Sequence, residues 1–381
     1  VVMGSATPSV DAYYRAKTGQ YRLYRMQDRP EGSVLPSVYT IDLREELKQG
    51  NRSVFSRKLR ELMQDRLQRG EQTILFLNRR GYAGFISCRA CGHVMKCPHC
   101  DVSLSEHRNG KLVCHYCGYE EPAKKICPAC GSKYLMGFKA GTEQIEEAIH
   151  REFPTARVLR MDADTTRTKG SYEKILSAFA EEEADILLGT QMIVKGHDFK
   201  GVTLVGVLAA DLSLNQNDYR AGERTFQLLT QAAGRAGRGE KPGEVVIQTY
   251  RPDHYSIVHA AAQDYEGFYE EEIMYRQFMR YPPVEHMLAV LIVSAQPESG
   301  EALAQELVRL IRERQQDGLC VIGPAEATIG RINDQYRHLF YVRQKDYQVL
   351  VGIKDCLEQY IKTKEIRNQT VQFDFDPMSC Y

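Results

Sequence analysis

The sequence lacks any long apolar run, any secretion signal and any net charge. No apolar stretch in its 381 residues approaches the roughly 20 residues that a membrane-spanning helix needs, so we expect no membrane partner. The first residues carry no charged region followed by an apolar core and a small-residue cleavage site, which leaves the cytoplasm as the default compartment. Lys and Arg number 50, as do Asp and Glu, so binding of nucleic acid would need local basic patches.

Length and composition predict a multidomain globular protein. A chain of 381 residues is too long for one ordinary hydrophobic core, and its hydrophobic fraction of 43% and charged fraction of 26% are typical of folded domains. We therefore expect two or three domains.

Cysteine is concentrated in one segment. Eight of the eleven cysteines form four C-x-x-C pairs: Cys88, Cys91, Cys97, Cys100, Cys114, Cys117, Cys127 and Cys130. Two such pairs complete a closed tetrahedral thiolate site of the structural kind. Four pairs therefore predict two zinc ions, whereas disulfides are disfavoured because nothing in the sequence indicates secretion.

Spacing alone leaves the assignment of pairs to ions open. The 13 residues between Cys100 and Cys114 resemble the loop of a zinc ribbon, which favours a nested arrangement. The inner ion would then be held by Cys97, Cys100, Cys114 and Cys117, and the outer ion by Cys88, Cys91, Cys127 and Cys130. We expect the metal to fold this segment, because so short a stretch with few large apolar residues cannot bury a core of its own.

Around the cysteines, short apolar runs alternate with helical patterns. Strands are predicted at 72–78, 156–162, 184–190, 202–211 and 243–250, and helices at 56–70, 142–153, 171–183 and 223–237. This alternation predicts a doubly wound parallel sheet with helices on both faces. The cysteine segment follows the first of these strands, so it is expected to be an insertion at 86–137.

Beyond residue 254 the pattern changes to an aromatic and charged helix followed by further strands and helices. Strands are predicted at 287–295, 338–344 and 371–375, with a helix at 299–315. The sequence Tyr281-Pro282-Pro283 predicts a stiff entry to the first of these strands. We expect a separate α+β domain at 254–381.

Three polar signatures occur in a fixed order along the chain. They are GSAT at 4–7, GTQMIVKGHDF at 189–199 and QAAGRAGR at 231–238. Ligands of doubly wound sheets bind at the carboxyl ends of the strands, and we expect the signatures there. Each is weak alone, but their order resembles motifs III, V and VI of superfamily 2 helicases.

Other segments narrow the resemblance to one family. The eight-cysteine insertion resembles that of the PriA family of primosomal replication-restart helicases, as do FLNRRGYAGF at 76–85 and the segments 141–147, 160–166, 280–283 and 371–378. The resemblance covers essentially the whole chain. It implies the tail of a first helicase lobe and a linker at 1–36, a RecA-like second lobe at 37–253 with the zinc-binding insertion, and the C-terminal α+β domain.

The resemblance also implies roles for individual residues. Arg235 and Arg238 would reach the γ-phosphate of ATP across the cleft between two lobes, with Gln231 as a supporting polar contact. Nucleotide state would be relayed to DNA through Gly4, Ser5 and Thr7. The DNA backbone and nucleotide would be contacted by Gly189, Thr190, Gln191, Lys195 and Gly196, the two glycines permitting close backbone approach.

The phosphate-binding loop and the acidic Mg²⁺ motif that a helicase needs are missing. The one Gly-Lys step, Gly110-Lys111, is followed by Leu112 and lies among the cysteines. We therefore expect the chain to be the C-terminal portion of a longer protein, with ATP and Mg²⁺ as cofactors of the intact form and negligible ATPase activity of the chain alone.

The resemblance implies an ATP-dependent 3′→5′ DNA helicase that acts in replication restart and primosome assembly at stalled forks. Implied partners are single-stranded and forked DNA, other primosome proteins and the single-stranded-DNA-binding protein. The alternative is a zinc-ribbon module that binds nucleic acid or protein without motor activity.

Overall fold

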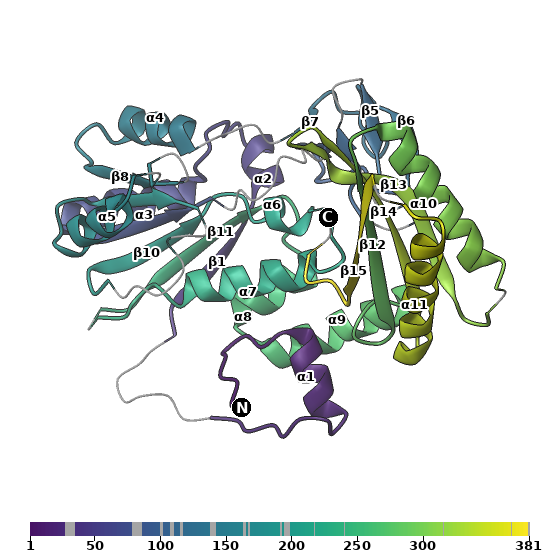
Figure 1. Cartoon of the computed structure of the whole chain (residues 1–381). Helices are drawn as coiled ribbons and strands as arrows, with labels where there is room; N and C mark the ends of the chain where they lie inside the picture. Colours follow the sequence, from purple (N-terminus) through teal and green to yellow (C-terminus); the bar gives the residue numbers. More distant parts are fainter. Residues whose placement is uncertain are drawn as a thin grey trace.

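The chain folds into a parallel α/β lobe, a cysteine-rich module and an antiparallel C-terminal sheet (Figure 1). This computed structural model describes residues 1–26, 35–77, 86–99, 102–106, 110–114, 117–137, 142–162, 165–166, 168–190, 193, 199–216, 218–239, 241–314, 316–366 and 368–379. Within these ranges, no helix combines the length and the apolar character needed to cross a bilayer.

A six-stranded parallel sheet forms the centre of the lobe. Its strand order is β1-β11-β10-β2-β9-β8, and every neighbouring pair is parallel. The strands are β1 (Ser37–Asp42), β2 (Gln72–Phe76), β8 (Val158–Met161), β9 (Ile186–Gly189), β10 (Val202–Val207) and β11 (Glu244–Thr249). The predicted parallel sheet of a RecA-like lobe is confirmed.

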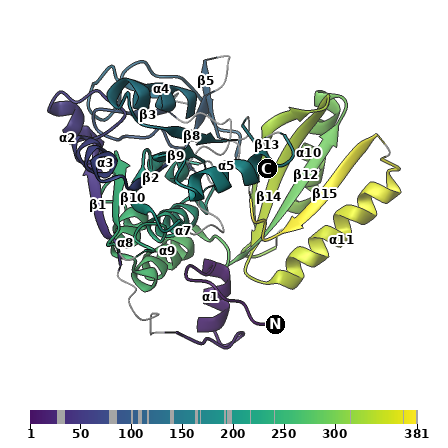
Figure 2. The same cartoon turned by 90° about the vertical axis from the view of Figure 1, so that its left-hand side faces the viewer.

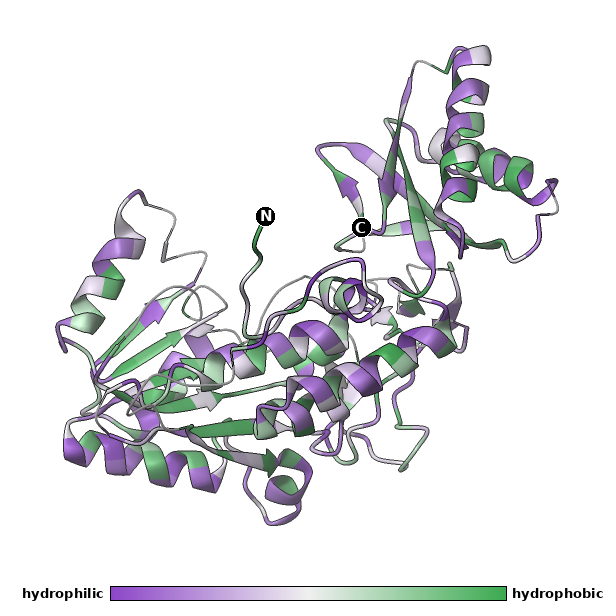
Figure 3. Cartoon of the chain, turned by 90° about the horizontal axis from the view of Figure 1, so that it is seen from below, coloured by the Kyte–Doolittle hydropathy of each residue, from purple (hydrophilic) through white to green (hydrophobic). Residues whose placement is uncertain are grey.

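Both faces of this sheet are covered by helices, because successive strand residues point to opposite sides. Ile74 and Phe76 pack in one apolar cluster, and Leu75 and Leu77 in another. The first cluster includes side chains of α5 (Ser171–Ala180) and α7 (Ala221–Ala233), and the second those of α3 (Arg57–Arg69) and α4 (Thr142–Glu152). Figure 3 shows these strands as largely hydrophobic and the helices as two-faced.

Helices α8 (Tyr255–Ala262) and α9 (Tyr265–Met279) also pack on the lobe. Ile257, Phe268 and Ile273 are buried in the same cluster as the sheet residues, and Phe226 of α7 stacks on Phe268 at a centroid distance of 4.2 Å. Helix α1 (Val10–Lys17) joins this cluster through Val10 and Tyr13. Figure 2 shows α8 and α9 beside α7 at the lower part of the lobe, and the C-terminal sheet begins after α9, at residue 286.

The sequence missed one strand of the lobe and placed the ends of two other elements too late. Strand β1 was not predicted, because as an edge strand its residues are mostly half-buried rather than apolar. The strand predicted at 202–211 ends at Val207, since the chain turns into helix α6 (Asp211–Leu214), where buried Asp211 accepts hydrogen bonds from Thr249 and Tyr250. The helix predicted at 223–237 ends at Ala233.

The cysteine-rich module consists of short antiparallel strands. Strands β3 (Ile86–Cys88) and β7 (Leu135–Gly137) pair at its base, and β4 (Ser105–Glu106), β5 (Lys111–Val113) and β6 (Glu120–Pro122) form a small sheet. Earlier in the chain, α2 (Leu43–Lys48) follows β1 directly.

The C-terminal domain is a four-stranded antiparallel sheet with two helices. The strand order is β13-β14-β12-β15, and the elements are β12 (His286–Ser294), α10 (Pro297–Arg312), β13 (Cys320–Ile332), β14 (Gln335–Gln344), α11 (Tyr347–Thr363) and β15 (Gln369–Phe375). Side chains of both helices bury one face of the sheet, whereas the other face shares a cluster with the cysteine-rich module. The predicted α+β fold of the C-terminal domain is confirmed, with β13 as a strand that the sequence did not indicate, whereas its predicted bounds of 254–381 stay a prediction.

Candidate functional site

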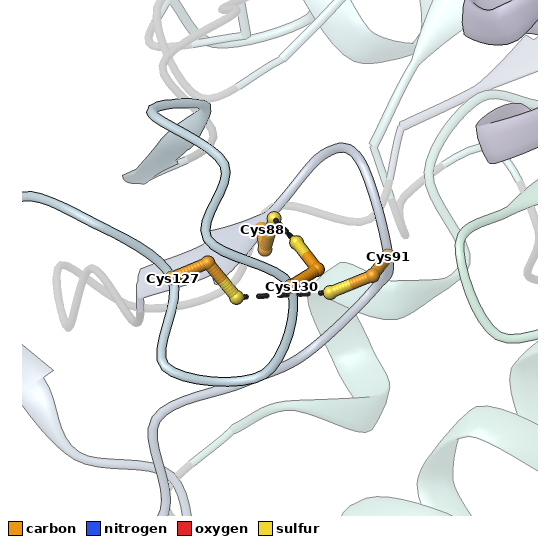
Figure 4. A group of neighbouring side chains, drawn as sticks. All are labelled: Cys88, Cys91, Cys127 and Cys130. Carbon is orange, nitrogen blue, oxygen red and sulfur yellow. Dashed lines mark hydrogen bonds between the residues drawn. The ribbon is translucent and has the colours of Figure 1, made fainter.

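The outer cysteines form one cluster (Figure 4). The Sγ atoms of Cys88 and Cys130 lie 3.6 Å apart, those of Cys91 and Cys127 lie 3.7 Å apart, and all four sulfurs lie within 4.8 Å of one another. A tetrahedral zinc ion with Zn–S bonds of about 2.3 Å separates its sulfurs by about 3.8 Å, whereas a disulfide needs about 2.05 Å. The spacing therefore fits a zinc-thiolate site, and the four cysteines are those of the predicted outer ion.

Tight turns in the backbone hold each cysteine pair. Gly92 N donates to Cys88 O at 2.8 Å and Gly131 N to Cys127 O at 2.9 Å, and both glycines have positive φ, +75° and +71°. Burial raises the pKa of the Cys91 thiol to about 12. Burial also acts to raise that of Cys127, but backbone N–H groups and the neighbouring thiols lower it to about 7. A divalent cation would bind all four as thiolates, so the donor set fits zinc.

The inner cysteines form a second cluster. Cys97, Cys114 and Cys117 have their sulfurs within 4.8 Å of one another, and those of Cys97 and Cys117 lie 3.6 Å apart. Cys100 lies outside the described residues. The three described cysteines are the predicted members of the inner site, so the nested assignment of pairs holds for them.

The inner site lies against the C-terminal sheet. Cys97 and Cys114 share one apolar cluster with Leu104 and Leu112 of the module and with sheet residues Met287, Ala289, Leu291, Leu339 and Tyr341. Figure 1 shows β5 and β6 beside that sheet. The inner site is therefore part of the interface between two domains.

The arginine pair lies on a turn just after helix α7. Helix α7 ends at Ala233 and Gly237 has φ +72°, with Gly243 so close that a side chain at Gly237 would clash with it. Gln231 and Arg238 are exposed and Arg235 is half-buried. Arg238 Nε donates to Gly234 O at 2.7 Å.

This turn lies at the amino end of the sheet. Gly237 N donates to Val202 O at the start of β10, 3.1 Å away. The expectation that the signatures gather at the carboxyl ends of the strands is therefore wrong for Arg235 and Arg238, because the helix that carries them runs back to the start of the next strand.

The segment that contains residues 4–7 lies along α7, and it extends toward the helix end that precedes the arginine turn. Val10 N donates to Glu223 Oε1 at 2.9 Å, and Gln227 Nε2 donates to Thr7 O at 3.4 Å. Residue numbers fall along the N-terminal segment as they rise along α7, so the segment runs antiparallel to the helix. Thr7 is buried and its N–H donates to Ser5 Oγ at 3.1 Å, whereas Gly4 is exposed. The structure brings two of the three predicted signatures to one helix.

Of the third signature, the structure describes residues 189, 190, 193 and 199. Gly189 ends β9 at the carboxyl end of the sheet, and Thr190 N donates to Met161 O at 3.3 Å. A Cβ at Gly189 would lie 2.6 Å from Met161 O and 2.8 Å from Ile193 Cγ2, so this glycine permits a close contact within the lobe. Gln191, Lys195 and Gly196 lie outside the described residues.

A buried group of charged residues was not predicted. We call Asp11, Arg220, Glu223, Glu272 and Arg276 the ion cluster. Arg276 is fully buried and donates to Glu223 Oε2 at 2.6 Å and to Glu272 Oε1 at 2.8 Å, and Arg220 binds Asp11. Burial raises the pKa of Glu272; it acts to raise that of Asp11 too, but the hydrogen bond from Arg220 holds it below its ordinary value. No sequence signal marked this cluster, because its members come from three separate helical segments.

A cleft of about 1130 Å³ lies between the cysteine-rich module and the lobe. Arg44 and Arg251, which follow strands β1 and β11, contribute to its lining. Its charged side chains are four basic and four acidic ones, namely Arg44, Lys96, Lys124, Arg251, Glu121, Asp218, Asp253 and Glu271. Because these charges balance, the cleft by itself does not identify a nucleic-acid site.

Comparison with known proteins finds the same three parts. Residues 131–240 match the helicase conserved C-terminal domain, residues 97–122 the PriA DNA helicase Cys-rich region (CRR) domain, and residues 277–378 the primosomal protein N C-terminal domain. Among solved structures, S. cerevisiae Dbp5 bound to RNA and ADP BeF3 overlaps 71% of this chain and 51% of its own at 11% identity, with a TM-score of 0.32, and we draw nothing from so slight a likeness.

Curated relatives match along the whole chain. Replication restart protein PriA of Bacillus subtilis is 46% identical over 379 residues, which is 99% of this chain and 47% of that protein. Replication restart protein PriA of Synechocystis is 42% identical over 388 residues, which is 100% of this chain and 46% of that protein. The chain thus spans about half the length of the curated relatives it matches.

Fold, cysteine clusters and matched regions together define a class: a RecA-like helicase lobe with a zinc-binding module and an added antiparallel domain. The order of these parts and the identity along the full chain narrow the class to one family. The chain belongs to the PriA family.

Proposed function

We propose that this chain supplies the second motor lobe, the zinc module and the C-terminal domain of an ATP-dependent DNA helicase. The helicase would translocate 3′→5′ on single-stranded DNA in the cytoplasm, remodel stalled forks and assemble the primosome. One observation carries the proposal: Thr7 of segment 4–7 contacts Gln227 of α7, and the arginine turn at 235–238 directly follows the same helix. Family membership supports it.

The arginines would act on the phosphates of ATP. Charge spreads over the transferred phosphoryl oxygens in the transition state, and a planar guanidinium can donate two parallel hydrogen bonds to them. A positioned arginine of this kind is worth roughly 10³–10⁵ in rate. Exposed Arg238 and half-buried Arg235 can reach a ligand held by a neighbouring lobe, with Gln231 beside them. The phosphate-binding loop and the Mg²⁺ ligands would come from that lobe.

DNA and partner proteins would be bound by other parts of the chain. We assign backbone contacts to Thr190, Gln191 and Lys195, whose side chains can donate to phosphate oxygens. The zinc module and the C-terminal sheet, which share one apolar cluster, would form a single platform for forked DNA, primosome proteins and the single-stranded-DNA-binding protein. The zinc ions would be structural, because the outer set is a closed site of four cysteines and the inner set brings together three of its four predicted cysteines.

The proposal is tested with Arg235→Lys and Arg238→Lys in the full-length protein that contains this chain. Lysine keeps the positive charge but lacks the planar fork, so we expect each change to lower the kcat of DNA-stimulated ATP hydrolysis by about 10³. The Kd for single-stranded DNA should stay within threefold of the wild type. Arg224→Lys in α7 is the matched control, since Arg224 pairs with Asp218 within the chain.

A kcat within threefold of the wild type in both arginine variants would contradict the assignment. A second measurement concerns the 381-residue chain alone. Because its sequence lacks the phosphate-binding loop, we expect no DNA-stimulated hydrolysis above background, and robust hydrolysis by the purified chain would overturn the division of labour between lobes. The alternative of a zinc-ribbon binding module without motor activity is not favoured, because the helicase match covers residues 131–240.

A further inference from the structure

The ion cluster joins four segments of the chain at one guanidinium group. Arg276 of α9 donates from Nη2 to Glu223 in the first turn of α7 and from Nε to Glu272 of its own helix. Its Nη1 donates to Pro282 O at 3.0 Å, just before β12, and lies 3.6 Å from Asp11 Oδ2 in α1. The arginine therefore connects the N-terminal segment, the lobe and the entry to the C-terminal sheet.

Geometry around this arginine is tightly determined. The exposed fraction is 0% for Arg276 and Glu272 and 4% for Glu223, so water cannot replace a lost partner. Tyr255 OH donates to Glu272 Oε2 at 2.7 Å, and a Cβ on Gly222 would lie 2.8 Å from that hydroxyl. Because a guanidinium is a rigid planar fork, it fixes the directions as well as the distances of its partners.

Glu223 connects α7 to the N-terminal segment and to Arg276. One carboxylate oxygen accepts from Val10 N, three residues after Thr7, and the other accepts from Arg276. Helix α7 has 13 residues, a rigid rod of about 20 Å, with the arginine turn at its far end. A change in the direction of the first turn is therefore transmitted to Arg235 and Arg238.

We propose that Glu223 and Arg276 are positioning residues, which fix the arginine turn relative to segment 4–7 and to the entry of the C-terminal sheet. The proposal rests on the function proposed above. It gives the C-terminal domain a mechanical connection to the nucleotide-facing arginines: a movement of the sheet at Pro282 displaces Arg276, and Arg276 displaces α7 through Glu223. Neither residue contacts nucleotide or DNA itself.

Hydrogen exchange tests this connection without any catalytic readout. The chain is compared as wild type, as Glu223→Gln and as the control Glu270→Gln, which changes an exposed glutamate of α9. We expect backbone amides of 231–239 to exchange at least tenfold faster in Glu223→Gln, with β10 and the zinc module unchanged. Faster exchange throughout the lobe would indicate general destabilisation, and an unchanged exchange rate at 231–239 would show that Glu223 is not connected to the turn. Either result overturns the proposal.

A kinetic measurement in the full-length protein separates positioning from nucleotide binding. Glu223→Gln should lower the kcat of DNA-stimulated ATP hydrolysis at least tenfold and leave the KM for ATP within twofold, because the phosphate-binding loop lies elsewhere. Unchanged kcat would overturn the proposal. If the wild type itself hydrolyses no ATP, the proposed function fails and the exchange measurement alone decides. Should Glu223→Gln not fold, Asp11→Asn at the edge of the cluster carries the same expectations, since Asp11 is partly exposed.

Discussion

Loss of the inner zinc site should destabilise the C-terminal sheet, whereas loss of the outer site should not. The two perturbations are the double changes Cys114→Ser with Cys117→Ser, and Cys88→Ser with Cys91→Ser. Each removes one C-x-x-C pair and should release one zinc ion, so the chemistry of the two variants is matched. They differ in location, because the inner cysteines belong to the cluster that covers the sheet and the outer ones do not.

The size of the effect follows from the apolar side chains at that interface. Met287, Leu291 and Leu339 are almost fully buried there, and burial of such a side chain stabilises by about 1.5–3 kcal/mol. Together this is roughly 5–9 kcal/mol, an upper bound because unfolded chains retain some burial. Partial detachment that cost only about 2 kcal/mol would lower the midpoint of a domain of about 100 residues by roughly 8–16 °C.

The assay combines metal content with calorimetry. Zinc per chain is measured by atomic emission, and thermal unfolding by differential scanning calorimetry. We expect two zinc ions in the wild type, one in each double variant, and a lowered transition of the C-terminal domain in the inner variant alone. Equal shifts in both variants would refute the reasoning from the shared cluster, and one zinc ion in the wild type would refute the two-site assignment.

Two further predictions concern single contacts. Gly92→Ala should destabilise by about 1–3 kcal/mol, because its Cβ would lie 2.5 Å from Tyr250 O, whereas Gly118→Ala should cost less, since it has the same positive φ but its nearest neighbour is 3.5 Å away. Equal denaturant midpoints would contradict this. The hydrogen bond to Asp376 raises the pKa of His286 above its ordinary 6.5, so the bridge stabilises below about pH 6.5 and its contribution is lost as the pH rises through the raised value. The melting midpoint of the wild type minus that of His286→Gln should therefore decrease as the pH rises from about 6 to 8. A difference that does not change with pH would refute this role of the bridge.

The features that the sequence predicted correctly depend on local chemistry. Cysteine pairs separated by two residues can bind one ion in any surroundings, so the clusters followed from spacing, and the zinc-ribbon-like loop between Cys100 and Cys114 favoured their nesting. Parallel strands such as β2 and β9 are buried along their length and mostly apolar, so their short apolar runs could be recognised in the sequence. The end of α7 was placed too late, because the glycines at 234 and 237 were read as part of the helix.

The ion cluster could not be predicted, because its partners are distant in sequence. Glu223 and Arg276 are 53 residues apart, and Val10 and Glu223 are 213 apart. In the sequence each charged member reads as an ordinary surface residue of a helix, and only the packing of α1, α7 and α9 buries them together. The position of the arginine turn could have been predicted, because a helix between two strands of a parallel sheet always runs back to the amino end of the sheet.

The shared interface beneath the C-terminal sheet also bears on how the protein is made. The inner cysteines leave the ribosome long before β12 and β14, the strands that cover them. Until those strands are synthesised, the nascent module presents Leu104 and Leu112 without their partners, even when its metal is bound. During synthesis the module therefore carries an uncovered apolar surface until the last strands of the chain have been made.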